Sequence, residues 1–367
     1  MARFQTVLFF AALATLTSCV TSRNLNERHR VGVRVFDPKI NLEKPVATAD
    51  FSGWHLSGKH TLIGVLENIW VVAYDLKDSK VLWFTQTNSD IASALTVSEK
   101  DVFLGLRDGK YLRLDAKTGA IVWTRQLERF VARPARVVGE RVFVISSGQQ
   151  LYALRKSDGT PEWIYDAGFP EGLALQGAAA PVVVEDNVYI GLANGELLSI
   201  NTVTGKPVWR EASSDTDNRF HDVMGDIAFV NGRIVFARYD GQVAAYTVNA
   251  SSGLKVWEDK LPSVTAAVVK DDKYMVATNL GDVVMYKADS GKKLWTAVTG
   301  TSISGITLHK DIVYASGSNG RINAIDAKNG KLLWTDDVLG RILSGAFLYR
   351  DAIYFPTGYK NIYGYQL

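Results

Sequence analysis

Apolar and polar residues alternate in short runs along most of this chain, and turn residues separate the runs. The clearest copy starts with an apolar stretch at 102–106, turns at Asp108-Gly109, alternates over 110–115 and ends on a stretch that contains Trp123. Asp-Gly and Asn-Gly pairs supply the positive φ angles of tight hairpins, and the alternation has the period of a strand. We therefore expect three antiparallel strands in each copy, and no segment shows a sustained helical period.

A tryptophan ends each copy, and its recurrence predicts a repeat protein. Seven tryptophans follow one another at steps of 40, 40, 46, 48, 38 and 39 residues: Trp83, Trp123, Trp163, Trp209, Trp257, Trp295 and Trp334. A glycine stands four residues before the tryptophan in six copies, and Ser79 takes that place in the first. Such a repeat indicates β-propeller blades, with the fourth strand of each blade after the tryptophan, as in 173–184 or 302–308. One tryptophan per blade favours packing between blades over a single cofactor site.

Counting hairpins gives eight blades rather than seven. The last hairpin, 353–367, ends where the tryptophan-bearing strand should begin. The alternating stretch 31–36 lies at the other end of the folded chain, so we expect it to complete the last blade and close the ring. Residues 31–367 number 337, about 42 for each of eight blades, which matches the repeat. The predicted fold is all-β: a single eight-bladed β-propeller of four-stranded antiparallel blades over 31–367.

The N-terminus predicts export and lipidation. Residues 1–18 combine a basic residue, a short apolar run and small residues, as in a secretory signal peptide. Leu16-Thr17-Ser18-Cys19 resembles the bacterial lipobox, and lipidation explains why an exported chain has Cys19 as its single cysteine. In lipobox proteins the residue after the cysteine directs sorting, and Val20 favours the outer membrane. Residues 19–30 are then the lipid anchor and a polar tether. The alternative is a plain secretion signal with an incidental cysteine.

Composition excludes some functions. Hydrophobic residues make up 47% and charged residues 22%, ordinary values for a globular protein. The net charge of +3, from 41 basic and 38 acidic residues, comes with no basic stripe, which argues against a nucleic-acid partner.

The sequence offers no pattern of catalytic or metal-ligating residues. Five histidines are present, and none stands in a zinc-binding arrangement. Three aspartates precede second turns, where a carboxylate accepts hydrogen bonds from turn N–H groups: Asp75, Asp115 and Asp326. No Gly-x-Ser-x-Gly or Ser-x-x-Lys sequence suggests a nucleophile. We expect no catalytic residue, no metal and no cofactor.

The tryptophan-and-glycine repeat resembles the pyrroloquinoline-quinone-type propellers, which include alcohol and glucose dehydrogenases. The alcohol dehydrogenases of that group place the quinone against a vicinal disulfide, and this chain has no Cys-Cys pair. A lipobox followed by eight such blades resembles the BamB family, lipoproteins of the outer-membrane β-barrel assembly machine. The resemblance implies a non-enzymatic scaffold that is anchored in the outer membrane and faces the periplasm. Its implied partners are BamA, other lipoproteins of the machine and unfolded outer-membrane proteins.

Two local matches carry the implied BamA contact. A family loop reads Leu-x-Leu-Arg-Gly-x-Ser-Ala-Pro, and here Leu173 and Leu175 are kept while Gln176 replaces the arginine. A family Asp-Val-Asp patch keeps its first aspartate as Asp222 and has Met224 in place of the second. Losing one positive and one negative position removes charge-assisted contacts, so the partner surface is expected to differ or the pairing to be weaker.

Other interpretations of the same residues stay open. Leu173 and Leu175 could be core residues of a strand that lines the ring, since such a strand alternates in the same way. For the whole chain, one alternative is an exported propeller that binds a quinone or another small molecule. Another is a structural lipoprotein of the envelope with a different partner.

Overall fold

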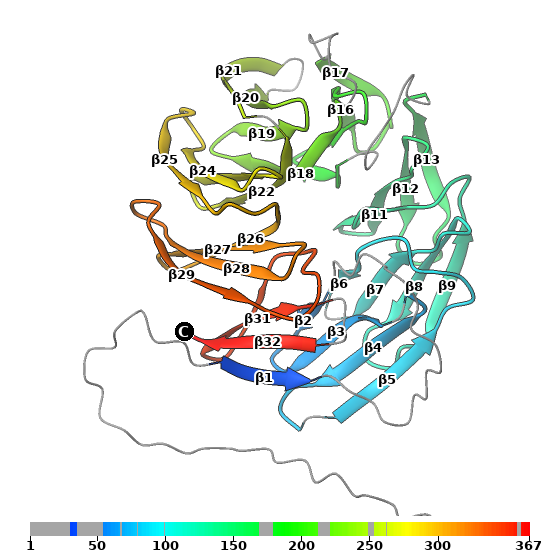
Figure 1. Cartoon of the computed structure of the whole chain (residues 1–367). Helices are drawn as coiled ribbons and strands as arrows, with labels where there is room; N and C mark the ends of the chain where they lie inside the picture. Colours follow the sequence, from blue (N-terminus) through cyan, green and yellow to red (C-terminus); the bar gives the residue numbers. More distant parts are fainter. Residues whose placement is uncertain are drawn as a thin grey trace, which may run out of the picture.

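The computed structural model describes residues 30–34, 54–66, 68–78, 80–98, 100–168, 179–211, 221–248, 253–261, 263–357 and 361–367. These residues form 32 strands in eight four-stranded antiparallel sheets. Figure 1 shows the sheets arranged as blades around a ring. The prediction of an eight-bladed β-propeller is confirmed. Among the described residues, no helix has the length and apolar character needed to cross a membrane.

Blades 1 to 7 each use four consecutive strands, a to d, from the axis outward. Blade 1 contains β2 (His55–Ser57), β3 (Thr61–Leu66), β4 (Trp70–Asp75) and β5 (Lys80–Gln86), and blade 2 contains β6 (Thr96–Val97), β7 (Asp101–Gly105), β8 (Lys110–Asp115) and β9 (Ile121–Gln126). Blade 3 contains β10 (Arg136–Val138), β11 (Arg141–Ile145), β12 (Gln150–Arg155) and β13 (Pro161–Asp166), and blade 4 contains β14 (Val182–Val184), β15 (Asn187–Gly191), β16 (Leu197–Asn201) and β17 (Pro207–Glu211).

Blade 5 contains β18 (Val223–Val230), β19 (Arg233–Arg238), β20 (Gln242–Val248) and β21 (Gly253–Lys260). Blade 6 contains β22 (Val264–Lys270), β23 (Lys273–Thr278), β24 (Asp282–Lys287) and β25 (Lys293–Val298). Blade 7 contains β26 (Ile303–His309), β27 (Ile312–Gly317), β28 (Arg321–Asp326) and β29 (Leu332–Asp337). Blade 8 contains β30 (Phe347–Tyr349), β31 (Ala352–Pro356), β32 (Asn361–Gln366) and β1 (Arg30–Arg34).

The N-terminal strand closes the ring, as the sequence predicts. β1 pairs antiparallel with β32, from Arg30 opposite Tyr365 to Arg34 opposite Asn361. β1 (blue) lies beside β32 (red) in Figure 1. The closing strand therefore begins one residue earlier than the predicted 31–36 and covers the edge of β32, which would otherwise be open for pairing.

The antiparallel order divides the turns between two ends of the propeller. Turns a–b and c–d lie at one end, which we call the turn face. Hairpins b–c and the connections from strand d to the next blade lie at the other end, which we call the connection face. β1 occupies position d of blade 8, so its first residue, Arg30, lies at the turn face.

The Asp-Gly pair of blade 2 forms a hairpin with a three-residue loop. The Gly109 N–H donates to Leu106 O (3.0 Å), and the Leu106 N–H donates to Lys110 O (2.7 Å). Only the glycine has positive φ, at 86°, so the pair makes a type I turn followed by a left-handed residue. Asp108 Oδ1 accepts a hydrogen bond from the Lys110 N–H (3.1 Å), which supports the turn.

Aspartate carboxylates support the c–d turns in the way the sequence predicts. Asp115 Oδ1 accepts hydrogen bonds from the N–H of Lys117 (3.0 Å) and of Thr118 (2.8 Å) and from the Thr118 hydroxyl (2.8 Å). The hydroxyl of Thr118, followed by its N–H, holds the pKa of Asp115 below its usual value. Asp75 and Asp326 accept equivalent bonds from their own turns.

The recurrent tryptophans lie between neighbouring blades. The Trp123 indole N–H donates to Lys156 O of blade 3 (2.9 Å), and its ring covers Gly159, where an added Cβ would lie 2.7 Å from Cε3. Each ring thus occupies the space that a side chain would need at the glycine of the next c–d turn. The same arrangement pairs Trp83 with Gly119, Trp163 with Gly205, Trp209 with Gly253, Trp257 with Gly291 and Trp295 with Gly330.

Candidate functional site

The structure describes two of the five predicted contact residues. The segment between β13 and β14 contains Leu173, Leu175 and Gln176, which lie outside the described residues. The other two, Asp222 and Met224, are described and lie at the start of β18. The first segment connects β13 of blade 3 to β14 of blade 4, and Asp222 and Met224 follow the connection from β17 of blade 4 to β18 of blade 5.

Asp222 and Met224 are buried, with exposed fractions of 0% and 2%. The backbone carbonyl of Asp222 accepts a hydrogen bond from the Tyr239 N–H (2.9 Å). Met224 pairs with Ala237 and packs in the apolar cluster between blades 5 and 6, with Val264 and other residues. Methionine suits this site, since a carboxylate there would be surrounded by apolar groups. Neither side chain is presented to solvent.

A buried ionic network lies beside Asp222. His221 Nδ1 is 3.1 Å from Asp240 Oδ2, and Arg238 Nε donates to Asp240 Oδ1 (3.2 Å). The side chains of Arg238 and Asp240 are 4% and 2% exposed, and that of His221 is 19% exposed. Arg238 also reaches blade 4, where its Nη1 donates a hydrogen bond to Gly195 O (3.4 Å). The network therefore joins the hairpins of blades 4 and 5.

The close approach of the hairpins of blades 4 and 5 requires a glycine at position 195. Gly195 has φ of +82°, and an added Cβ would lie 2.9 Å from His221 O and 3.2 Å from Arg238 Cδ. Any side chain at this position would push the hairpin of blade 4 away from the network. The Val223 N–H, which donates to Leu192 O (3.3 Å), reinforces the same junction.

Blade 3 departs from the hairpin pattern of its neighbours. Gln149, with φ of +64°, takes the left-handed position that glycine occupies in the hairpins of blades 2, 4, 5, 6 and 7. Its Oε1 accepts a hydrogen bond from the Ala193 N–H of blade 4 (3.1 Å). A non-glycine residue in this conformation costs about 1–2 kcal/mol, so the bond to blade 4 offsets strain in the turn.

A hollow of 330 Å³ opens above this turn on the connection face, lined by Glu128, Arg129, Gly148, Gln150, Asp166 and Gly168. Gln150 forms its floor and is 9% exposed. Its Nε2 donates to Glu128 Oε2 (2.5 Å) and to Asp166 Oδ2 (3.2 Å), and its Oε1 accepts from the Tyr152 hydroxyl (2.7 Å). The polar atoms of the floor are thus satisfied within the propeller.

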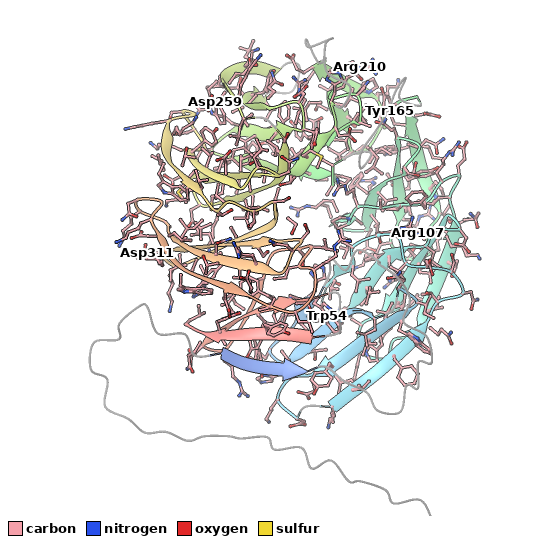
Figure 2. All side chains as sticks on the ribbon, in the orientation of Figure 1. Trp54, Arg107, Tyr165, Arg210, Asp259 and Asp311 are labelled. Atoms are coloured by element: carbon pink, nitrogen blue, oxygen red, sulfur yellow. The ribbon has the colours of Figure 1, made fainter. Side chains whose placement is uncertain are left out.

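Outer contacts join blades 3, 4 and 5 further from the axis. Figure 2 shows Tyr165 and Arg210 close together on neighbouring outer strands, where Arg210 Nη2 donates to the Tyr165 hydroxyl (3.4 Å). The Tyr246 hydroxyl donates to Glu211 Oε1 (2.9 Å) between blades 4 and 5. Burial, and then the bond to Glu211, raises the pKa of Tyr246 above its usual range. Side-chain hydrogen bonds therefore join blades 3, 4 and 5.

The described residues contain no group of three or more histidine, cysteine, aspartate or glutamate side chains that could hold a metal ion. His60 Nδ1 lies 2.9 Å from the Tyr349 hydroxyl at the junction of blades 1 and 8. Burial lowers the pKa of His55 below its usual value. Cys19, the predicted lipidation site, lies outside the described residues.

Sequence reasoning missed the residues that join the blades. Arg238 stands where the hairpins of blades 2 and 4 have Leu106 and Leu192, and Gln149 stands where five hairpins have glycine. Aligning the repeats position by position shows both departures. Their hydrogen-bond partners, in contrast, come from neighbouring blades, so the pattern of one repeat cannot identify them.

The chain is similar to known outer-membrane assembly factors. The family model described as outer membrane protein assembly factor BamB matches residues 67–297 and 247–366. A relative with this name from Bordetella pertussis is 26% identical over 340 residues, covering 88% of this chain and 86% of that relative.

Solved structures show the same fold. BamB from Moraxella catarrhalis superposes with a TM-score of 0.76 at 21% identity, covering 93% of this chain and all of that one. A quinohemoprotein alcohol dehydrogenase from Pseudomonas putida HK5 superposes with a TM-score of 0.65 at 12% identity, covering 87% of this chain and 75% of that one. At these identities the likenesses concern the fold alone. The match of the family model covers most of the chain, and the chain therefore belongs to the family of outer membrane protein assembly factor BamB.

Proposed function

We propose that this protein is a non-enzymatic scaffold of the β-barrel assembly machine that assists the folding and insertion of outer-membrane proteins. The observation that carries the proposal is the family match over residues 67–297 and 247–366, which includes both predicted contact segments. The name of the Bordetella pertussis relative, an outer membrane protein assembly factor, supports the same role. Other lipoproteins of the machine and unfolded outer-membrane proteins are further partners in this proposal.

The proposed docking site for a periplasmic domain of BamA is the connection face at blades 3 to 5. Leu173, Leu175 and Gln176 would contact the partner from the segment between β13 and β14. Asp222 and Met224 are buried, so their part in the proposal is to hold the neighbouring connection in place from below. An uncharged Gln176 would leave this surface with one charge fewer than the family pattern, so the contact would depend more on apolar burial.

The proposed anchor is a lipid on Cys19, which would hold the protein at the outer membrane on its periplasmic side. Residues 1–18 would be the signal peptide, 19–30 the anchor and tether, and 31–367 the propeller. Eleven residue steps separate Cys19 from Arg30, so the tether spans at most about 38 Å. Arg30 enters the ring at the turn face, which leaves the connection face free for a partner. Tethering would also raise the local concentration of the propeller near its membrane partner.

A quinone-binding enzyme is the alternative function. The likeness to the alcohol dehydrogenase supports a common fold, and fold alone does not carry the activity. Six of the seven repeat tryptophans each cover a glycine of the next blade, which accounts for their recurrence without a cofactor. Among the described residues, no contact favours the enzymatic function.

The contact proposal is tested by changing Leu173 and Leu175 together to serine and measuring co-purification with BamA from solubilised envelopes. We expect BamA recovery to fall while the melting temperature stays near that of the wild type. The matched control changes Leu280 and Leu339 to serine, because these leucines are 62% and 68% exposed on the same face in blades 6 and 7. Equal BamA recovery from both variants and the wild type would remove the loop from the contact. A stability loss in the first variant would place its leucines in the core instead.

The anchor proposal is tested separately by Cys19→Ala. The variant should fold and move from the membrane fraction to the soluble periplasm, since the ring buries its core without the lipid. Retention in the membrane after a high-salt wash would contradict lipidation as the main anchor.

A further inference from the structure

Buried charge is concentrated at the junction of blades 4 and 5. Among the described residues, three charged residues are buried as a whole: Asp101, Asp222 and Arg238. Asp101 lies on β7, where Arg113 (2.7 Å) and Lys156 (3.0 Å) neutralise it between blades 2 and 3. The other two belong to the connection face and lie beside the proposed docking site.

The hairpin of blade 5 does not need these charges to form its turn. Asn194, the counterpart of Asp240 in blade 4, supports its turn by accepting a hydrogen bond from the Glu196 N–H (3.1 Å). Asp108 does the same in blade 2 with a side chain that is 33% exposed. The residue before the turn is uncharged in the corresponding hairpins, where it is Leu106, Ser146, Leu192, Thr278 or Gly317 in place of Arg238.

The network fixes three consecutive residues of the chain where it enters β18. The ring of His221 bonds to Asp240, the carbonyl of Asp222 accepts from the Tyr239 N–H, and the Val223 N–H donates to Leu192 O. Arg238 joins the two hairpins by bonding to Asp240 and to the carbonyl of Gly195 in blade 4. Residues 221–223 are thus held by contacts to both blades.

Burying an ion pair is costly, because the lost hydration of both charges offsets much of their attraction. Apolar residues at the same positions would stabilise the propeller about as well. We infer that His221, Arg238 and Asp240 are positioning residues, which hold residues 221–223 in the geometry that partner docking requires. The statement that docking requires this geometry rests on the proposed function. The statement that the three residues position 221–223 rests on the hydrogen bonds between blades 4 and 5.

The test converts the hairpin of blade 5 to that of blade 4 by the double substitution Arg238→Leu and Asp240→Asn, which copies Leu192 and Asn194. The turn keeps its side-chain bond, and we expect Tm to stay within about 4 °C of the wild type. Amide hydrogen exchange of the peptide that contains residues 221–226 should accelerate by about tenfold, because the side-chain bonds of Arg238 and Asp240 that hold the two hairpins and His221 together are lost. The Kd for the periplasmic part of BamA should rise by about tenfold.

The control removes an exposed ion pair from another hairpin of the same face, by Asp108→Asn and Lys110→Gln in blade 2. It should change neither the exchange of residues 221–226 nor the Kd. Unchanged exchange in the blade 5 variant overturns the inference, whatever the partner does. Faster exchange with unchanged Kd also overturns it, because the fixed segment would then not matter for docking. A wild-type protein that fails to bind BamA instead contradicts the proposed function, and the exchange experiment still decides whether the network fixes the segment.

Discussion

The contact between tryptophan and glycine predicts that two glycines of blade 3 respond differently to alanine. Gly159 and Gly139 both lie on the turn face with positive φ, of 71° and 56°. An added Cβ at Gly159 would lie 2.7 Å from Cε3 of Trp123, whereas a Cβ at Gly139 meets nothing within 4 Å. Both alanine substitutions carry the cost of a left-handed conformation, and only Gly159→Ala also places a Cβ against the ring of Trp123.

The expected magnitudes follow from these two terms. A left-handed alanine costs about 1–2 kcal/mol, so Gly139→Ala should lower the free energy of unfolding by that amount. Gly159→Ala adds the cost of overpacking, about 1–3 kcal/mol. The ring of Trp123 has little room to move, because its N–H is bonded to Lys156 O (2.9 Å) and Phe103 packs against it. The extra cost lowers Tm by about 1.5 °C per kcal/mol, given an unfolding entropy of about 2.1 cal/mol/K per residue.

Thermal melting of the two variants measures this difference directly. A third measurement isolates the ring: in a Trp123→Ala background, Gly159→Ala should cost no more than Gly139→Ala, because the neighbour that the Cβ meets is gone. Equal Tm losses for Gly139→Ala and Gly159→Ala in the wild-type background would refute the packing argument. So would an undiminished cost of Gly159→Ala in the variant without the ring.

Three further predictions concern single side chains. Trp123→Phe should lower the free energy of unfolding by about 0.5–1.5 kcal/mol, because the hydrogen bond of the indole is lost. Trp209→Phe should lower it by less, because the Trp209 indole nitrogen has no hydrogen-bond partner among the described residues. Chemical denaturation of the two variants measures the difference. Met224→Asp should cost about 3–5 kcal/mol in the same assay, as an uncompensated buried charge does, whereas Met224→Leu should cost less than about 1.5 kcal/mol. The folded pKa of Asp115 lies below its unfolded value of about 3.9, so its stabilisation is present above that pH and lost as pH falls through the folded pKa. The Tm difference between the wild type and Asp115→Asn should therefore shrink in acid, and a constant difference from pH 7 to pH 2 would contradict this.

The blades, their number and the closing strand could be predicted from the sequence because the signals are local. A strand shows its period within a few residues, and a turn shows its type in one Asp-Gly or Asn-Gly pair. The exception in the repeat, in contrast, follows from the closure of the ring. Ser79 replaces the glycine in blade 1, and the preceding blade ends with β1, whose five residues include no tryptophan that would need the space.

The burial of Asp222 and Met224, two of the predicted contact residues, and the network beside them were decided by the tertiary structure alone. In the sequence, Asp222 and Met224 are part of a polar stretch that matches a contact patch, yet the propeller encloses both. Arg238 and Asp240 acquire their role from Gly195, which lies more than forty residues earlier in the chain and meets them only when blade 4 packs against blade 5. Strand period and turn type depend on neighbours along the chain, whereas burial and charge pairing depend on neighbours across an interface, and only the closed ring brings those together.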